Sequence, residues 1–276
     1  MNVQRLFLIL LSFSLVFSAC NSTVPDKIKP VHVDSSVYVA PPPGYIPKEE
    51  LNRYRNAIQD YYLHNLVEKG FNGGILVAKK GNVIFEAYHG FFNLKKKDSL
   101  TPHSAFHLAS VSKTFTAMAT LKLVEMGKLS LDDDLKKFFP GFPYDGVTVK
   151  LLLSHRSGLP NYIYFMQKLG WNTRQYCSNQ DVLSYLIQFK PPVNSKAGTR
   201  FEYCNTNYAL LGLIIEKASG TSYANFLQNI FFTPLHMNDT YVFNMTDSAK
   251  AMPSYYRGRQ ERLTFLDTGF GDKNIY

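Results

Sequence analysis

A serine and a lysine lie three residues apart in the stretch HLASVSKTFTA, residues 107–117. Positions i and i+3 of a helix share a face, so the amine of Lys113 can reach the hydroxyl of Ser110. At a helix start, unpaired backbone N–H groups favour negative charge on the serine oxygen. Burial of a lysine favours its neutral amine, which can accept a proton. The pair predicts a nucleophilic serine beside a base, and the alternative is a helix-capping serine with a solvent-exposed lysine.

A tyrosine two residues before an asparagine can extend such a site, and the chain contains this triplet three times. The triplets at 54–56 and 223–225 fall inside predicted helices, where a spacing of two points the side chains apart. The third follows an extended run, so alternation can direct Tyr203 and Asn205 the same way. There the phenol can relay a proton and the amide can bind a substrate carbonyl. A packed tyrosine beside an asparagine helix cap is the alternative.

The histidines predict neither a metal centre nor a further base. His103 and His107 have the spacing of metal ligands, but no glutamate follows His103 as H-E-x-x-H requires, and Pro102 indicates a turn. We interpret His155, in SHRSGLPNY, as a structural histidine, because buried histidines with satisfied nitrogens are the commoner case. No metal and no organic cofactor are expected.

The elements that must position these residues follow from periodicity and turn signals. A first helix is predicted over residues 48–70, and two β-rich runs on either side of Lys80 and Gly81 predict an antiparallel hairpin. Later helices are expected over residues 179–189, 206–218 and 221–231.

The serine and lysine belong to a predicted helix over residues 106–128. This segment is apolar on most sides, so we expect the helix to lie deep in the fold. The apolar positions that carry this expectation are Phe115, Met118, Leu121 and Val124.

Composition limits the class of protein. The chain has 276 residues, of which 45% are hydrophobic, and a formal net charge of +9. Its Lys and Arg residues are spread along the chain, so we read the charge as a solvated surface and expect no nucleic-acid partner.

The N-terminus has the pattern of a secretion signal. Arg5 precedes the apolar run LFLILLSFSLVF, which is too short to cross a hydrocarbon core of about 30 Å. FSAC, at residues 17–20, resembles a bacterial lipobox and predicts Cys20 as the lipidated residue that anchors the protein to a membrane of the cell envelope, facing the periplasm or the cell surface. Ordinary signal cleavage with Cys20 as a free thiol is the alternative. A disulfide between Cys177 and Cys204 is possible in an oxidising compartment and cannot be deduced from the sequence, and we favour two buried free thiols.

Three blocks of sequence, in order along the chain, resemble the serine β-lactamase-related family of class C β-lactamases, DD-peptidases and esterases. The resemblance implies an α+β fold, with an antiparallel sheet flanked by helices, a mostly helical lobe, and the active site between them. It also implies that Ser110 is the nucleophile, Lys113 its proton-abstracting partner, Tyr203 the tyrosine of the Y-x-N element and Asn205 a substrate-contacting amide. The blocks are FHLASVSKTFTAMATLKLVEMGKLSLDDDLKKFFP, VTVKLLLSHRSGLPNY and FEYCNTNYALLGLIIEKASG.

One element of the family pattern is not found after Tyr203. That element is a Lys or His followed by a small residue and Gly, on a strand that supplies an oxyanion-hole N–H; the nearest triplet, DTG at 267–269, begins with an acid. We therefore expect a signal peptide over 1–19, a proline-rich tether over 20–47 and an incomplete hydrolase domain over 48–276, without its C-terminal strands. A product ending at Tyr276 is expected to fold poorly and to be inactive.

The leading hypothesis is a serine hydrolase that forms an acyl-enzyme on Ser110 with an ester or amide substrate. Its substrate would be a small acyl compound or a peptide, with peptidoglycan and β-lactams as candidates, and the sequence does not fix the oligomeric state. Whether Lys113 or Tyr203 is the base stays open, because a close pair titrates together. The competing hypotheses are a non-catalytic binding lipoprotein of the cell envelope that keeps the cleft, a structural lipoprotein and an inactive fragment.

Overall fold

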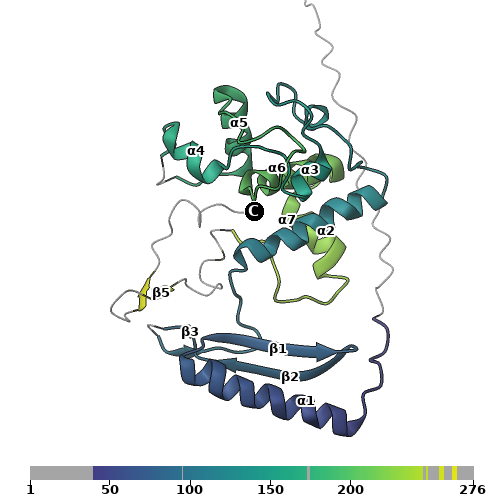
Figure 1. The fold of residues 1–276 in the computed structure, drawn as a ribbon, viewed down its shortest axis with the longest axis vertical. Helices are drawn as coiled ribbons and strands as arrows, with labels where there is room; N and C mark the ends of the chain where they lie inside the picture. The colour runs from purple at the N-terminus through teal and green to yellow at the C-terminus, as the bar shows by residue number, and fades with distance from the viewer. Residues whose placement is uncertain are drawn as a thin grey trace, which may run out of the picture.

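The computed structural model describes residues 40–94, 96–172, 175–244 and 247, together with the backbone of two short strands at 255–257 and 263–265. The predicted signal peptide, Cys20, most of the tether and the DTG triplet lie outside the described residues. Within them, a helix and a β-hairpin form one layer and a group of helices forms a separate lobe (Figure 1).

The hairpin layer contains helix α1 (Lys48–Tyr61) and strands β1 (Gly73–Lys79) and β2 (Asn82–His89). The predicted hairpin is confirmed, because Lys79 pairs with Asn82 and the two intervening residues both have positive φ. Such a two-residue turn matches the right-handed twist of the strands.

The predicted first helix is confirmed in its extent but not in its regularity. After α1 the helix continues as a π-helical segment, η1 (Tyr62–Leu66), and a 3₁₀ turn, η2 (Val67–Lys69). Tyr62 in η1 is buried and lies against Phe85 of β2, with ring centroids 5.4 Å apart. The helix thus covers one face of the hairpin.

Two further pairs of short antiparallel strands complete the β structure of the described residues. These are β3 (Phe91–Asn93) with β4 (Asp98–Ser99), and β5 (Tyr255–Arg257) with β6 (Leu263–Phe265).

The helical lobe is built around helix α6 (Asn205–Ser219), whose residues 206–215 are all buried. The surrounding elements are α2 (Ser112–Glu125), η4 (Leu135–Lys137), α3 (Val149–Leu153), α4 (Tyr162–Lys168), α5 (Asn179–Phe189), α7 (Tyr223–Leu227) and η5 (Gln228–Phe232). Helices α2, α3, α5 and α7 all pack on α6. A helix this apolar is stable only inside a ring of neighbours, and this burial forms the core of the lobe.

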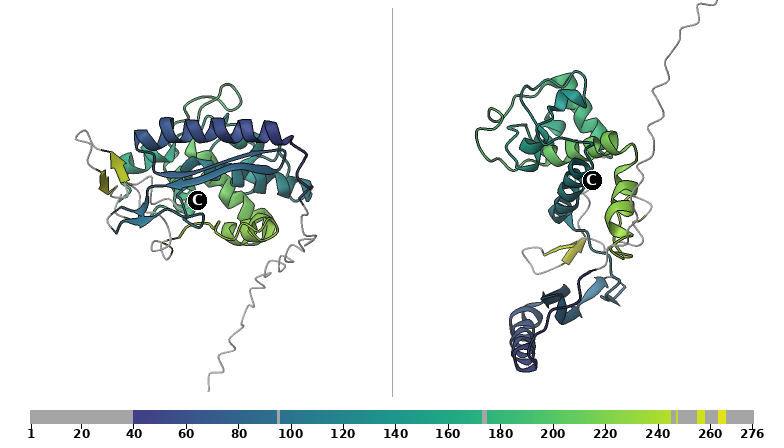
Figure 2. Two further views of the ribbon diagram at one scale, coloured as in Figure 1. Left: turned by 90° about the horizontal axis from the view of Figure 1, so that it is seen from below. Right: turned by 90° about the vertical axis from the view of Figure 1, so that its right-hand side faces the viewer.

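The expectation that the helix over 106–128 lies deep in the fold is wrong. Its regular part, α2, begins at Ser112, and two of the apolar residues that carried the expectation, Met118 and Leu121, are 55% and 45% exposed. Ala119 and Leu123 are buried, so α2 buries one side in the lobe and leaves another uncovered by the described residues. Figure 2 shows α2 on the side of the lobe nearer the hairpin layer.

Both cysteines of the lobe are buried and free, as expected. Burial raises the pKa of the Cys177 thiol to about 12 and also raises that of Cys204, which makes both thiols poor nucleophiles. None of the helices that the structure describes is both long and apolar enough to span a bilayer.

Candidate active site

Three side chains singled out in the sequence meet at one point of the lobe. The Ser110 Oγ lies 2.7 Å from the Tyr203 Oη, and the Lys113 Nζ donates to the same Ser110 Oγ at 3.2 Å. Ser110 lies in the 3₁₀ turn η3 (Ala109–Val111) and Lys113 in the first turn of α2, whereas Tyr203 comes from the segment that leads into α6. A serine hydroxyl bonded to both a phenol and an amine has two routes for its proton.

A strained turn presents Ser110. Ala109, the residue before it, has φ of +47°, in the left-handed region that an L-residue with a Cβ rarely adopts. The Ser112 hydroxyl donates to the Ala109 carbonyl and the Val111 N–H donates to the Leu108 carbonyl, and both bonds help to hold this turn. This turn leaves Ser110 exposed just before α2. Backbone strain of this kind is typical of functional positions.

Tyr203 is held by the loop that follows α3. The N–H groups on either side of it bond to one residue, since Glu202 donates to the His155 carbonyl at 2.7 Å and Cys204 donates to the His155 Nδ1 at 3.1 Å. The Tyr203 ring also packs on the His155 ring, with centroids 4.6 Å apart. Thr206 anchors the start of α6 by donating to the Pro160 carbonyl. The phenol therefore stands on a fixed backbone.

Electrostatics favour ionisation of the Tyr203 phenol. Partial burial raises its pKa, but hydrogen bonds with Ser110 and Lys113 and the charge of Lys113 outweigh burial and leave the pKa of Tyr203 below its usual value. The Lys113 Nζ lies 5.2 Å from the centroid of the Tyr203 ring. The lowered pKa makes the Tyr203 phenol easier to ionise, and an ionised phenol can take a proton from Ser110.

The site is open to solvent on one side. Tyr203 is 49% exposed and Lys113 is half-buried, not deeply buried as the sequence suggested, because the described residues leave that side of α2 uncovered. Asn205 is half-buried in the first turn of α6, and its side chain makes no hydrogen bond to any described residue. Its amide is thus available to a ligand.

The other two Y-x-N triplets lie away from Ser110. Tyr54 bonds to Glu50 on the surface of α1, and Tyr223 is buried with its hydroxyl 2.6 Å from that of Thr116. Tyr223 is thus a core residue of the lobe.

His103 is also used elsewhere, since its Nδ1 lies 2.9 Å from an Asp239 carboxylate oxygen. Over the part of the chain that the structure describes, no group of three or more His, Cys, Asp or Glu residues is arranged to hold a metal ion.

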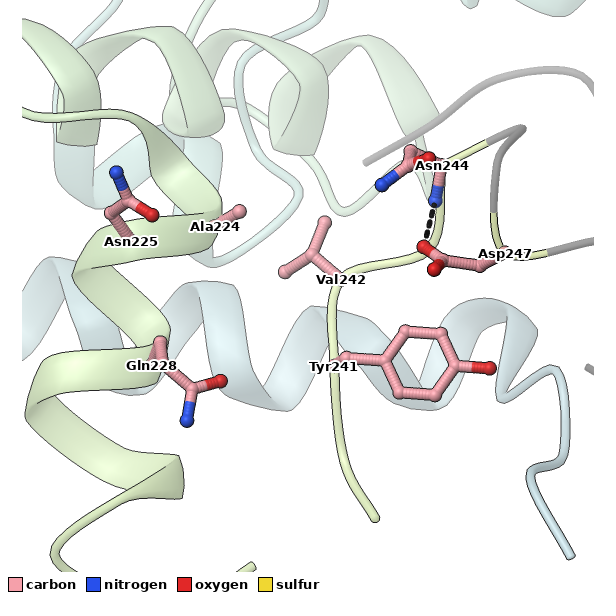
Figure 3. Close-up of a pocket in the computed structure, with 7 residues that line it drawn as sticks. All are labelled: Ala224, Asn225, Gln228, Tyr241, Val242, Asn244 and Asp247. Atoms are coloured by element: carbon pink, nitrogen blue, oxygen red, sulfur yellow. Dashed lines mark hydrogen bonds between the residues drawn. The ribbon is translucent and has the colours of Figure 1, made fainter. Parts of the chain in front are cut away.

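A hollow of about 350 Å³ lies elsewhere in the lobe, between α7 and a wall that includes Tyr241, Val242 and Asp247 (Figure 3). Ser110, Lys113 and Tyr203 do not line it, so it is distinct from the cluster at Ser110. The hollow is open and lined mostly by polar side chains, and these do not indicate a particular reaction or ligand. The lining residues are Ala224, Asn225, Gln228, Tyr241, Val242, Asn244 and Asp247.

The sequence matches the family described as "Beta-lactamase" over residues 61–269. It is 39% identical over 188 residues to "Penicillin-binding protein 4*" of Bacillus subtilis, which covers 68% of this chain and 42% of that protein. A penicillin-binding protein structure from Bacillus halodurans is similar with a TM-score of 0.65 and 30% identity, covering 74% of this chain and 63% of that one. The D-amino acid amidase of Ochrobactrum anthropi is similar with a TM-score of 0.63 and 26% identity, covering 81% and 64%.

The structural similarity confirms the predicted α+β fold, with antiparallel strands and a mostly helical lobe. The chain spans 42% of the length of the Bacillus subtilis protein and less than two thirds of each of the two solved chains. The shared region includes both segments that bring Ser110, Lys113 and Tyr203 together.

Proposed function

The chain belongs to the β-lactamase family of serine hydrolases, and we propose that it cleaves ester or amide bonds through an acyl-enzyme on Ser110. The observation that carries this proposal is the pair of contacts at the serine oxygen, 2.7 Å to the Tyr203 Oη and 3.2 Å to the Lys113 Nζ. Both distances are within reach for direct proton transfer.

In the proposed reaction, the Ser110 Oγ attacks the substrate carbonyl carbon while its proton passes to the Tyr203–Lys113 pair. The C–O bond to the serine forms, and the pair returns the proton to the leaving oxygen or nitrogen as its bond to carbon breaks. Water then attacks the ester, the pair takes its proton, and the acid is released as Ser110 regains its hydrogen. The pair titrates as a unit, so the proton is assigned to both groups together.

The Asn205 amide is proposed to bind the substrate next to the reacting carbonyl. It lies two residues beyond Tyr203 and faces no partner among the described residues. An amide N–H there can donate to a carbonyl of an amide or peptide substrate.

The substrate is proposed to be a small acyl compound or a peptide, with peptidoglycan and β-lactams as candidates. Similar proteins carry the names penicillin-binding protein and D-amino acid amidase, which supports amide chemistry of this class. The lipobox-like FSAC sequence at residues 17–20 supports an anchor at Cys20 that holds the enzyme at the cell envelope. Metabolic labelling with a fatty acid, lost in Cys20→Ala, would test the anchor.

The activity is tested by hydrolysis of a p-nitrophenyl ester and a D-amino acid amide by the purified natural protein, with a product ending at Tyr276, which is expected to be inactive, measured beside it. We expect turnover of at least one substrate that is lost in Ser110→Ala and retained in Ser184→Ala, an exposed serine of α5 whose hydroxyl donates to the Gln180 carbonyl. Absence of turnover in the folded wild-type protein, with its biological effect unchanged in Ser110→Ala, would favour a binding role.

A further inference from the structure

His155 lies between two tyrosine rings beside the cluster at Ser110. Its ring centroid is 4.6 Å from that of Tyr203 and 5.1 Å from that of Tyr208, and Phe201 meets its edge at 5.9 Å. The residue is buried, and its φ of +53° places it in the left-handed region. A buried polar ring in a strained backbone conformation requires specific partners.

Two donors are directed at one nitrogen of this ring. The Cys204 N–H donates to the His155 Nδ1 at 3.1 Å, and the Asn207 Nδ2 lies 3.4 Å from the same nitrogen. The orientation of Asn207 is set by Ser157, whose hydroxyl donates to the Asn207 Oδ1 at 2.6 Å. Because its oxygen is already used, Asn207 presents its NH₂ group to the imidazole.

This arrangement selects one state of the imidazole. A nitrogen that accepts from a backbone N–H carries no proton, so the neutral ring holds its hydrogen on Nε2. His155, Ser157 and Asn207 are all buried, and each has a hydrogen-bond partner in this network. Satisfied buried networks of this kind fix one geometry.

We propose that neutral His155 is a positioning residue that holds Tyr203 against Ser110, and that a proton on His155 switches acylation off. The proposal rests on the proposed function, since it concerns the same serine. His155 acts through Tyr203 and does not itself contact the Ser110 oxygen in the described structure.

A second proton can enter only at Nδ1, where it would face the Cys204 N–H and the Asn207 NH₂ group. Three donors would then meet without an acceptor, so the backbone next to Tyr203 must move. The new charge would also be near Lys113, on α2. The other titratable side chains against the ring are Tyr203 and Tyr208, whereas the Cys204 thiol is directed to the Leu159 carbonyl.

The surroundings of His155 favour its neutral form. Burial lowers the pKa of His155, and the charge of Lys113 lowers it further, so protonation begins below the ordinary value of about 6.5. The switch therefore acts as the pH falls into the acid range, and the active state is the one present at neutral and alkaline pH.

The first test compares His155→Asn with His155→Ala by the rate at which a fluorophosphonate labels Ser110 between pH 4.5 and 8. Asparagine tolerates the left-handed backbone and can place an acceptor near the Cys204 N–H, but it does not titrate. In His155→Asn we expect Ser110 to be labelled readily, without the decrease in labelling rate at acid pH. In His155→Ala we expect Ser110 to be labelled on the order of 10²-fold more slowly. An acid fall-off unchanged in His155→Asn would overturn the proposal.

The second test moves the switch without removing it. Asn207→Asp keeps the acceptor for Ser157 but places a carboxylate at Nδ1, which should raise the pKa of His155 by about one unit or more. The acid fall-off of labelling should rise by the same amount. Asn225→Asp, an exposed residue in the hollow of Figure 3, adds the same charge elsewhere and should leave the fall-off unchanged. A raised His155 pKa with an unmoved fall-off contradicts the proposal.

NMR of the His155 and Tyr203 rings separates this proposal from the proposed function. We expect the Tyr203 ring signals to shift at the pH where His155 titrates, whether or not Ser110 is reactive. If the folded protein is not labelled at any pH, the proposed function fails. If the Tyr203 ring signals do not shift where His155 titrates, the positioning role is overturned, whether or not Ser110 is labelled.

Discussion

The helical lobe and the hairpin layer use their apolar residues differently. The buried cluster of the lobe is continuous, from Ala119 in α2 to Phe232 in η5, with α6 at its centre. Among the described residues, the buried apolar side chains outside this cluster are Tyr62, Ile84 and Leu100, and α1 buries none. The lobe thus has a packed core. The hairpin layer is thin, with a helix that covers one face of the hairpin (Figure 1).

This difference explains where the candidate catalytic side chains are. Ser110 and Lys113 lie at the N-terminal end of α2, which packs on α6. Tyr203 lies two residues before the first residue of α6. Interatomic distances that must hold to a fraction of an ångström are thus supported by the continuous buried core of the lobe. On the hairpin, Leu76 is 57% exposed. The hairpin layer contributes none of the side chains bonded to Ser110 in the described structure.

The largest expected effect compares two tyrosines, one from each region. Tyr203→Phe removes the hydroxyl 2.7 Å from Ser110 and should slow acylation by about 10²–10⁴-fold. Tyr54→Phe, which removes a hydroxyl bonded to Glu50 on α1, should leave the acylation rate unchanged. Stopped-flow or labelling kinetics measure both. Equal losses in the two variants would mean that the chemistry does not depend on the lobe.

A smaller effect compares two leucines by urea unfolding. Leu210 in α6 is 0% exposed, so Leu210→Ala should lower the free energy of unfolding by about 2–5 kcal/mol through lost burial and a cavity. Leu76→Ala, on the uncovered hairpin face, should change it by no more than about 0.5 kcal/mol. If Leu76→Ala is as damaging as Leu210→Ala, another part of the protein covers the hairpin face in solution.

The smallest effects concern pH, and here the two regions have opposite signs. Burial lowers the pKa of His155 in the lobe, so the unfolded chain binds more protons and stability falls as the pH drops below about 6.5. In the hairpin layer a hydrogen bond with Glu68 raises the pKa of His64, so its contribution is present below about pH 6.5 and is lost as the pH rises through the raised value.

Melting temperatures measured between pH 5 and 8.5 distinguish these contributions. His155→Asn should flatten the acid loss of stability, and His64→Gln should lower stability slightly at pH 5 with no change at pH 8.5. Because His64 is fully exposed, its effect should also fade at high salt, whereas that of His155 should persist. A matching pH response in both variants would contradict the contrast between the regions.

Local signals in the sequence predicted the elements that depend on local chemistry. The helix over 179–189 matches α5, because Ser178 and Asp181 form a capping box and Lys190 ends the helix in the left-handed conformation. The hairpin follows in the same way from Lys80 and Gly81.

What the sequence could not predict depends on contacts between distant segments. The depth of α2 was misjudged because an apolar pattern does not say which of its sides has a partner. The network at His155 was missed because Ser157 and Asn207 are 50 residues apart and no spacing rule connects them. The choice of Tyr203 among three similar triplets was possible only because its context, between an extended run and a helix, could be read locally.

A covalent bond to Ser110 is tested most directly by the mass of the intact protein after brief exposure to a fluorophosphonate or a β-lactam. We predict a single adduct that maps to the peptide containing Ser110, persists in Ser184→Ala and disappears in Ser110→Ala. An adduct that survives in Ser110→Ala, or a folded wild-type protein that forms none with either reagent, would contradict the proposed acyl-enzyme.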